Sequence, residues 1–348
     1  MVPTRRCTRK MRSARKEPRK RALLKFGFAA AASVALVAYG VPVRAQNYPE
    51  RPVRLVVPFA PGGETDLIGR LWAKYAALHL GGGIVVENKA GAGGAIGAAE
   101  VARSKPDGYT LLSGTTTTQI IYPAAMANPP YDPLRDFIGV GIISTTPTAV
   151  VVHPSLPART LQELAAMAKS SPGKYSYGSA GPGTITNLTG ELFKLQGGGL
   201  EIQHVPYKGA GPGLQDLIAG HIMMFTPILS SSVLAQHRAG RLRILAINGD
   251  ARVKSAPDIP TAAESGMPGM RVQVFNAIFA PAGTPPAVIE ALHLATVKAK
   301  ADAGLRRDLE NAGAEMAADL SPEQAAAHIR DETVRWRPIV KATGFRID

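Results

Sequence analysis

The stretch Val53-Arg54-Leu55-Val56-Val57-Pro58-Phe59-Ala60-Pro61-Gly62-Gly63-Glu64-Thr65-Asp66 decides the fold, because an apolar run leads through a glycine-rich turn into a helical pattern. Residues 53–59 are typical of a buried strand, and residues 66–80 repeat apolar side chains at the spacing of one helix face. A helix that begins in this way presents unpaired backbone N–H groups and the positive end of its dipole. The stretch therefore predicts a cradle for an anion.

A second loop of the same construction, Ser179-Ala180-Gly181-Pro182-Gly183-Thr184, follows the β-rich residues 175–178 and precedes another helical pattern. One exposed helix N-terminus stabilises an anion by about 0.3–1 kcal/mol. Micromolar binding needs about 8 kcal/mol, in addition to what association costs in lost motion. We therefore expect both loops to close on one small anion from opposite sides. Such binding needs no catalytic side chain.

The charge of the chain is concentrated at its start. The 348 residues carry a formal net charge of +14, but residues 1–45 hold twelve Lys and Arg against the single acid Glu17. The remaining 28 basic and 25 acidic residues leave a net charge of only +3. No basic patch with interleaved aromatic residues follows residue 45, so we expect no binding to nucleic acid.

Residues 1–45 have the layout of a secretory signal peptide: a basic segment to Lys25, an apolar segment over 26–41, and small residues before a cleavage site after Ala45. The apolar segment is shorter than the roughly 20 residues of a spanning helix, although an uncleaved anchor stays an alternative. The only cysteine, Cys7, lies in this leader, so we expect no disulfide and no cysteine metal site after cleavage. These features predict a periplasmic protein.

After the leader, short β-rich runs alternate with helical patterns as far as residue 340, which predicts an α/β fold with parallel sheets. In open sheets of this kind ligands bind beyond the carboxyl ends of the strands, where both glycine-rich loops are expected. Pro-rich or turn-rich stretches at 143–148 and 272–281 indicate crossings between two domains. We expect residues 46–144 plus 277–348 to form domain 1, and residues 145–276 to form the inserted domain 2.

Patterns that would indicate an enzyme are incomplete. Residues 91–97 resemble a dinucleotide fingerprint, but Ile96 stands where the third glycine belongs. Ser179 lies in Gly178-Ser179-Ala180-Gly181, which is not the Gly-x-Ser-x-Gly elbow of hydrolases. The seven histidines show no metal-ligand spacing. We therefore predict a protein that is not an enzyme and needs neither cofactor nor metal, with a periplasmic hydrolase as the rival from another class.

Six segments resemble one known family in the same order along the chain. They are Pro58–Gly63 with Thr65-Asp66, Glu87–Gly94, Pro106–Leu112, Tyr177–Gly181 with Gly183-Thr184, Val205–Gly209 with Gly211-Pro212, and Gly240–Arg243. Together they are similar to the Bug family of periplasmic solute-binding proteins, which resemble the binding component of tripartite tricarboxylate transporters. The segment Gly220–Phe225 departs from the family pattern because it contains no Asp.

The resemblance implies a two-domain periplasmic-binding-protein fold of the Venus-flytrap, type II-like kind, with a cleft between the lobes. It implies a receptor for a small organic acid anion (a dicarboxylate, a tricarboxylate or an aromatic acid), which acts as a monomer and delivers the ligand to the membrane subunits of a tripartite tricarboxylate-type transporter. A sensor that feeds a signalling system is the alternative. By matching motif, the implied ligand contacts are Phe59, Gly62, Gly63, Thr65, Asp66, Gly114, Thr115, Thr116, Ser179, Ala180, Gly181, Gly183 and Thr184.

Overall fold

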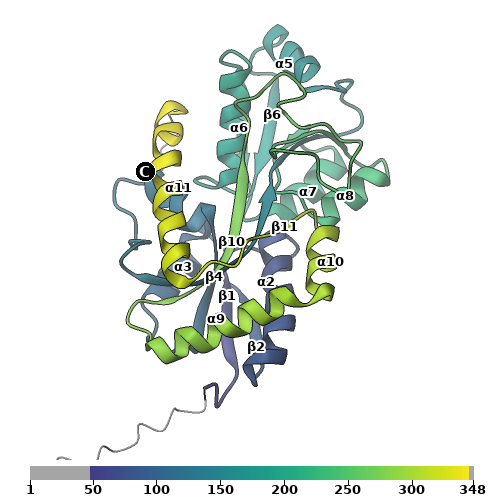
Figure 1. Cartoon of the computed structure of the whole chain (residues 1–348). Coiled ribbons are helices and arrows are strands. Elements are labelled where there is room, and N and C mark those ends of the chain that lie inside the picture. The colour runs from purple at the N-terminus through teal and green to yellow at the C-terminus, as the bar shows by residue number, and fades with distance from the viewer. Residues whose placement is uncertain (1–47, 345–348) are drawn as a thin grey trace, which may run out of the picture. The chain divides into compact units, whose positions relative to one another are not determined.

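The computed structural model describes residues 48–344 (Figure 1), so the expected signal peptide lies outside the described residues. Residues 48–344 belong to one compact unit. Among them, no helix combines the length and the apolar character that a membrane crossing requires.

The first sheet contains the strand that the opening stretch predicted. Its six strands lie in the order β11-β4-β10-β3-β1-β2, with β1 near one edge between β2 and β3. All three of these strands are parallel, whereas β10 pairs antiparallel with β3 and β4. The strands span Val53–Val57 (β1), Ile84–Asn88 (β2), Thr110–Thr115 (β3), Phe137–Pro147 (β4), Gln273–Pro281 (β10) and Glu315–Met316 (β11).

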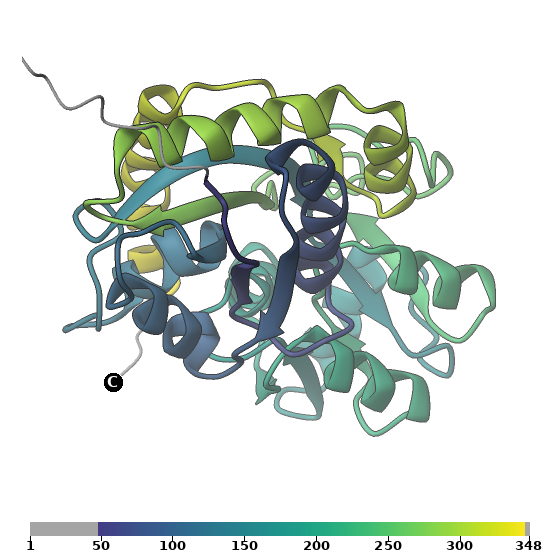
Figure 2. The same ribbon diagram turned by 90° about the horizontal axis from the view of Figure 1, so that it is seen from below.

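Helices cover both faces of this sheet and form two separate cores. On one face Trp72, Leu292 and Leu305 are completely buried, from helices α2 (Glu64–Leu80), α9 (Pro286–Ala301) and α10 (Ala303–Asn311). The helices of this face lie side by side when the molecule is seen from below (Figure 2). The other face carries α3 (Ala95–Ala102), the π-helical turn η2 (Thr117–Ile121), α4 (Tyr122–Ala125) and α11 (Pro322–Ala342).

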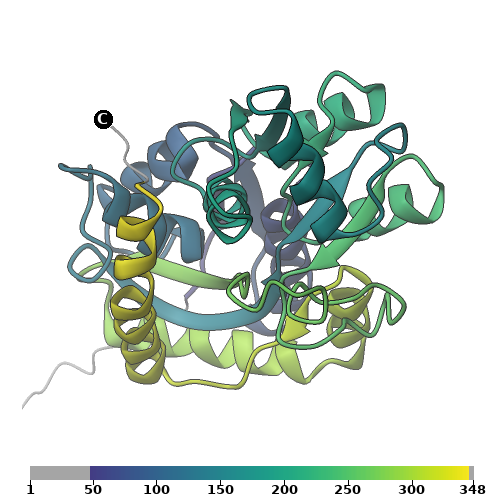
Figure 3. The same ribbon diagram turned by 90° about the horizontal axis from the view of Figure 1, so that it is seen from above.

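The second sheet has five strands in the order β7-β6-β8-β5-β9. They span Ala149–Val152 (β5), Tyr175–Ser179 (β6), Ile202–Pro206 (β7), Met224–Phe225 (β8) and Arg243–Ile247 (β9). Helices α5 (Leu161–Ser170) and α6 (Ile185–Gln196) contribute to the core on one face. Helices α7 (Ala210–Ala219) and α8 (Ser231–Arg238) contribute to the core on the other (Figure 3). The molecule is therefore an α/β protein with two lobes.

Two expectations about the sheets were wrong. Both sheets are mixed rather than parallel, because β10 runs against its neighbours in the first sheet and β5 runs against β8 and β9 in the second. The stretches 143–148 and 272–281 are mostly strand rather than turn, since they form the end of β4 and nearly all of β10. Glycines at 139 and 141 and the prolines at 147 and 281 hide this character in the sequence.

The chain passes from the first sheet to the second between β4 and β5, where Thr148 is completely buried. The backbone N–H of Thr148 donates to Val272 O at 3.0 Å, on the segment that returns to β10. Asn248 joins the same point, because its N–H donates to Thr148 O at 2.8 Å and its side-chain amide donates to Thr148 Oγ1 at 2.9 Å. The two crossing segments are thus tied together where a hinge between the lobes would lie.

Candidate functional site

The first glycine-rich loop ends at the N-terminus of α2. Gly63 is the N-cap residue and no side chain caps the helix. The N–H groups of the first helical turn have no partner within a helix, so those of Glu64 and Thr65 are free to meet a ligand. Gly62 at φ +87° makes the turn that exposes them, a conformation that favours glycine.

Asp66 holds this loop in shape. Its carboxylate accepts from the backbone N–H of Gly62 at 3.1 Å, from Arg70 Nε at 3.0 Å and from the side-chain amide of Asn88 at 2.9 Å. Burial opposes ionisation of Asp66, but these hydrogen bonds outweigh it and lower its pKa. Asp66 therefore stays charged and positions the loop, and the Gly62 N–H is already used.

The second loop ends at the N-terminus of α6, where the hydroxyl of the N-cap residue Thr184 accepts from the backbone N–H of Asn187 at 3.2 Å. The Ala180 N–H donates to Thr186 Oγ1 at 2.9 Å. The N–H of Ile185, the first residue of α6, donates to Thr117 Oγ1 at 3.0 Å. Because Thr117 belongs to the first lobe, this bond joins the two lobes at the helix N-terminus.

Both glycine-rich loops contribute residues to the lining of one small cavity. Its volume is about 20 Å³, which is space for roughly one water molecule. An organic acid with several heavy atoms needs more room, so the loops must move apart before such a ligand binds. Of the expected contact residues, those that line the cavity are Phe59, Gly63, Thr65, Ala180 and Thr184.

The remaining expected contacts lie outside the lining of this cavity: Gly62, Asp66, Gly114, Thr115, Thr116, Ser179, Gly181 and Gly183. Several of them have structural partners instead. A Cβ at Gly114 would lie 2.5 Å from the ring of Phe279, and Thr116 Oγ1 accepts from the Phe275 N–H at 2.9 Å. The loop after β3 reaches the cavity one residue later than the motif match suggested, through Thr117.

Six residues that line the cavity were not expected from the sequence: Glu64, Thr117, Ile185, Thr186, Ala210 and Ile228. Ala210 begins α7, and its Cβ lies 3.6 Å from where a Cβ on Gly63 would be. The start of α7 therefore faces the first loop across the cavity. The resemblance over Val205–Gly209 with Gly211-Pro212 was the only signal for this segment.

Glu64 is the one acid in the cavity lining, and only 3% of its surface is exposed. Its Oε1 accepts from Thr146 Oγ1 and from the side-chain amide of Asn276, both at 2.6 Å. Burial raises the pKa of Glu64 to about 7, although these hydrogen bonds and one from Thr65 oppose the shift. A carboxyl group that titrates near neutrality therefore lies beside the expected anion cradle.

Ser179 is paired with His204, a contact that the sequence did not predict. Ser179 Oγ lies 2.7 Å from His204 Nε2, and burial lowers the pKa of this histidine. The ring of His204 stacks on Tyr177 with 5.0 Å between centroids. Within residues 48–344 no carboxylate hydrogen-bonds to the other ring nitrogen, and Ser179 is completely buried. The pair lacks the third member and the access of a hydrolase triad.

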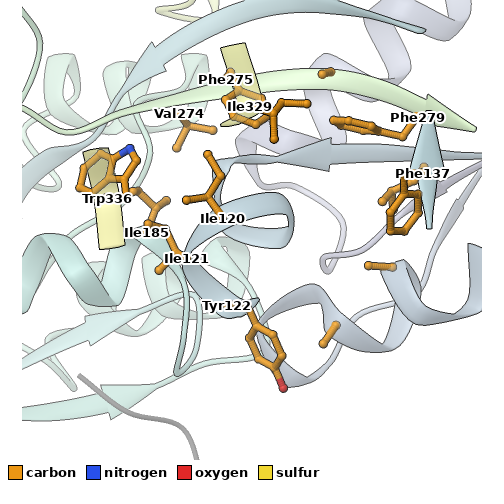
Figure 4. Packing of buried hydrophobic residues seen from close by; sticks show 14 of the residues in the cluster. Ile120, Ile121, Tyr122, Phe137, Ile185, Val274, Phe275, Phe279, Ile329 and Trp336 are labelled. Atoms are coloured by element: carbon orange, nitrogen blue, oxygen red, sulfur yellow. The ribbon is translucent and has the colours of Figure 1, made fainter. Parts of the chain in front are cut away.

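An apolar cluster continues the contact between the lobes beyond the cavity. Figure 4 shows Ile185 of α6 beside Ile121 of η2 and Trp336 of α11, and all three are completely buried. Because α6 belongs to the second lobe and the other two elements to the first, separating the lobes would expose this cluster.

The part of the chain that the structure describes contains no group of three or more His, Cys, Asp and Glu side chains able to hold a metal ion. The expectation that no metal is needed therefore stays a prediction.

Comparison with known proteins identifies relatives along nearly the whole chain. A family model described as "Tripartite tricarboxylate transporter family receptor" matches residues 68–345. The structure of the periplasmic binding protein BugD is 32% identical with a TM-score of 0.82, covering 86% of this chain and 99% of that one. MatC from Rhodopseudomonas palustris, with bound malate, is 31% identical with a TM-score of 0.80, covering 84% and 100%.

A second protein of the same organism, Rpa4515 with adipate, is 33% identical with a TM-score of 0.82, covering 86% of this chain and 99% of that one. The resemblance stated from the sequence motifs and the two-lobe fold expected from it are thereby confirmed.

Proposed function

Because this chain belongs to the family of tripartite tricarboxylate transporter receptors, we propose that it captures a small organic carboxylate in the periplasm and presents it to the membrane subunits of such a transporter. The family consists of solute-binding receptors rather than enzymes. Relatives of this fold have been solved with malate and with adipate, two dicarboxylates, which supports the ligand class.

The observation that carries the proposal is that the two glycine-rich loops, one from each lobe, line a single cavity. The N-termini of α2 and α6 meet there, so the positive ends of two helix dipoles act on the same small volume. In the proposed complex the ligand carboxylate accepts from the backbone N–H groups of Glu64 and Thr65 and from that of Thr186. Hydrogen bonds to a charged group contribute roughly 1.5–3 kcal/mol each, so donors from both loops are needed to approach the roughly 8 kcal/mol of micromolar binding.

We further propose the division into residues 46–144 plus 277–348 and residues 145–276 as the two moving bodies. Support comes from the buried crossing at Thr148, which the Val272 backbone and Asn248 tie together. Rotation about this point would separate Thr117 from the Ile185 N–H and open the cavity.

A thermal-shift screen of the secreted form against organic acids tests the proposal, because a ligand that binds only the folded state raises its melting temperature. We expect one or a few carboxylates to raise it, with calorimetry then giving a 1:1 complex. No response to any carboxylate, with a response to cations or neutral sugars instead, would contradict the proposal.

The contact between Ser179 and His204 gives the rival hydrolase one specific observation in its favour. Ser179→Ala distinguishes the two functions. A receptor shows no turnover of acyl or phosphate esters in either form, whereas a hydrolase loses measurable turnover in the variant.

A further inference from the structure

Glu64 occupies an unusual position for a site that holds an anion. It is the first residue of α2, it lines the cavity between the lobes, and it is almost completely buried. None of the ion pairs within residues 48–344 includes it. When ionised it would repel a carboxylate bound at the same helix end, because the low dielectric of a buried site strengthens the repulsion.

The hydrogen bonds of Glu64 leave one of its oxygens with spare capacity. Oε1 already accepts two short bonds, from Thr146 Oγ1 and Asn276 Nδ2 at 2.6 Å each. Oε2 has one contact, with Thr65 Oγ1 at 3.4 Å, which is longer than the usual 2.5–3.0 Å of a hydroxyl donor. Oε2 can therefore accept from a further donor in the cavity.

Polar atoms close to Glu64 are also left without hydrogen-bond partners. Asn276, whose amide N–H donates to Glu64, has an Oδ1 atom with no partner in the described part of the chain. Thr115, directly opposite Asn276 in the pairing of β3 and β10, likewise has an unpartnered hydroxyl. Both side chains are 1% exposed, and buried polar atoms are rarely left without a partner. Two neighbours of Glu64 thus carry buried polar atoms without a partner in residues 48–344, beside the spare capacity of Glu64 Oε2.

We propose that Glu64 is a specificity-determining residue, which selects organic acids that carry a hydrogen-bond donor, either an ammonium or a hydroxyl group, beside the carboxylate. This inference rests on the proposed function. The ligand carboxylate is held by the helix N-termini, and the adjacent donor is held by Glu64 Oε2. An acid with only hydrogen on the carbon beside its carboxylate leaves Glu64 Oε2 without a donor. It also places its own negative charge next to the charge of Glu64, with no hydrogen bond to offset the repulsion.

Matched sets of acids test the inference: succinate, malate and aspartate; glutarate, 2-hydroxyglutarate and glutamate; 3-phenylpropionate, phenyllactate and phenylalanine. Within each set only the group on the carbon beside the carboxylate changes, from hydrogen to hydroxyl to ammonium. Calorimetry at pH 8 keeps Glu64 ionised, because its pKa is about 7. Glu64→Gln is the test variant, and Glu290→Gln, an exposed glutamate of α9 outside the cavity lining, is the matched control.

We expect the wild type to bind the hydroxyl or ammonium member of at least one set about tenfold or more tightly than the unsubstituted member, since a hydrogen bond to a charged group is lost in the latter. Glu64→Gln should remove this preference, because its amide would keep the bonds to Thr146 and Asn276 with its oxygen and present a donor to the ligand. Glu290→Gln should keep it. The ammonium and hydroxyl members of each set identify which donor Glu64 prefers.

Two results would overturn the inference in different ways. If the unsubstituted acids bind the wild type as tightly as their substituted partners, or if Glu64→Gln keeps the preference, the role of Glu64 is wrong while the receptor function stands. If no acid in any set binds either form, the proposed function fails and the inference with it. Ratios of affinities within one variant do not depend on how much of it folds.

Discussion

Single residues decide how closely the two lobes approach at the cavity. Gly63 has φ −85°, which any residue can adopt, and a Cβ there would meet Ala210 Cβ at an ordinary 3.6 Å. Gly181 differs, because it has φ +130° and its Cβ would lie 2.9 Å from the carbonyl oxygen of Tyr207. A side chain at 181 would strain the second loop itself, so Gly63 is the better place to probe the cavity.

We predict that Gly63→Leu abolishes ligand binding and lowers the free energy of unfolding by about 1–3 kcal/mol, because its side chain does not fit the space of about 20 Å³ and pushes the two loops apart. Calorimetry with the acid found in the screen, together with urea unfolding, measures both effects. Gly83→Leu is the control, since no heavy atom lies within 4 Å of a Cβ there. Unchanged affinity in Gly63→Leu would remove the first loop from the site.

Glu64 should make stability depend on pH. Its pKa rises from 4.5 in the unfolded chain to about 7 in the folded protein, so between these values the folded state holds a proton that the unfolded state has lost. The free energy of unfolding therefore falls as pH rises from 4.5 to 7, by about 3 kcal/mol in total, and this contribution is constant above pH 7.

Glu64→Gln has no proton to lose, so unfolding in urea at pH 5 and at pH 7.5 should show the variant gaining stability relative to the wild type at the higher pH. A difference between wild type and variant that is the same at both pH values would show that the carboxyl group ionises normally in the folded protein.

At the scale of elements, removing a helix N-cap at the site and one outside it distinguishes an effect on ligand binding from an effect on stability. Thr184 caps α6 at the site, and Thr160 caps α5 outside it, and each accepts from a backbone N–H three residues on, at 3.2 and 3.1 Å. We predict that Thr184→Ala and Thr160→Ala each lower the free energy of unfolding by about 1 kcal/mol. Only Thr184→Ala should also weaken ligand binding, because it loosens the second loop. Equal affinities in the two variants would contradict the role of that loop.

Sequence patterns predicted the strands and helices whose structure is determined by residues close together in the chain. The apolar run over residues 53–59 predicted β1, and the helical spacing over residues 66–80 predicted α2. The strands β4 and β10 were missed as strands, because each pairs with partners more than 100 residues away in the chain. Their β structure comes from those partners rather than from their own alternation.

The same limit applied to the site. The two loops could be predicted to meet, since each is a strand–glycine–helix junction at the carboxyl end of its strand. Thr117 and Ala210 could not, because their place in the cavity depends on how the lobes pack. Glu64 lies inside the stretch 53–66, but its partners Thr146 and Asn276 lie on two strands that are distant in the chain. Its burial could therefore not be predicted from the sequence.

At the scale of the whole molecule, the apolar contact between the lobes provides a reporter of closure. Trp336 is completely buried against Ile185 of the second lobe, and the chain has only one other tryptophan, Trp72. In Trp72→Phe all tryptophan emission comes from Trp336. We predict that a saturating acid shifts this emission to shorter wavelength, because closure removes water from the indole. Calorimetric binding without any change in emission would argue against a movement of α6 relative to α11.

The central claim is that one carboxylate lies between the N-termini of α2 and α6. A crystal structure with the acid that most raises the melting temperature tests it most directly. The account predicts that the carboxylate oxygens lie within hydrogen-bond distance of the backbone N–H groups of Thr65 and Thr186. A ligand found elsewhere, such as in the pocket lined by Val253, Arg306 and Met316, with the two loops still in contact, would contradict it.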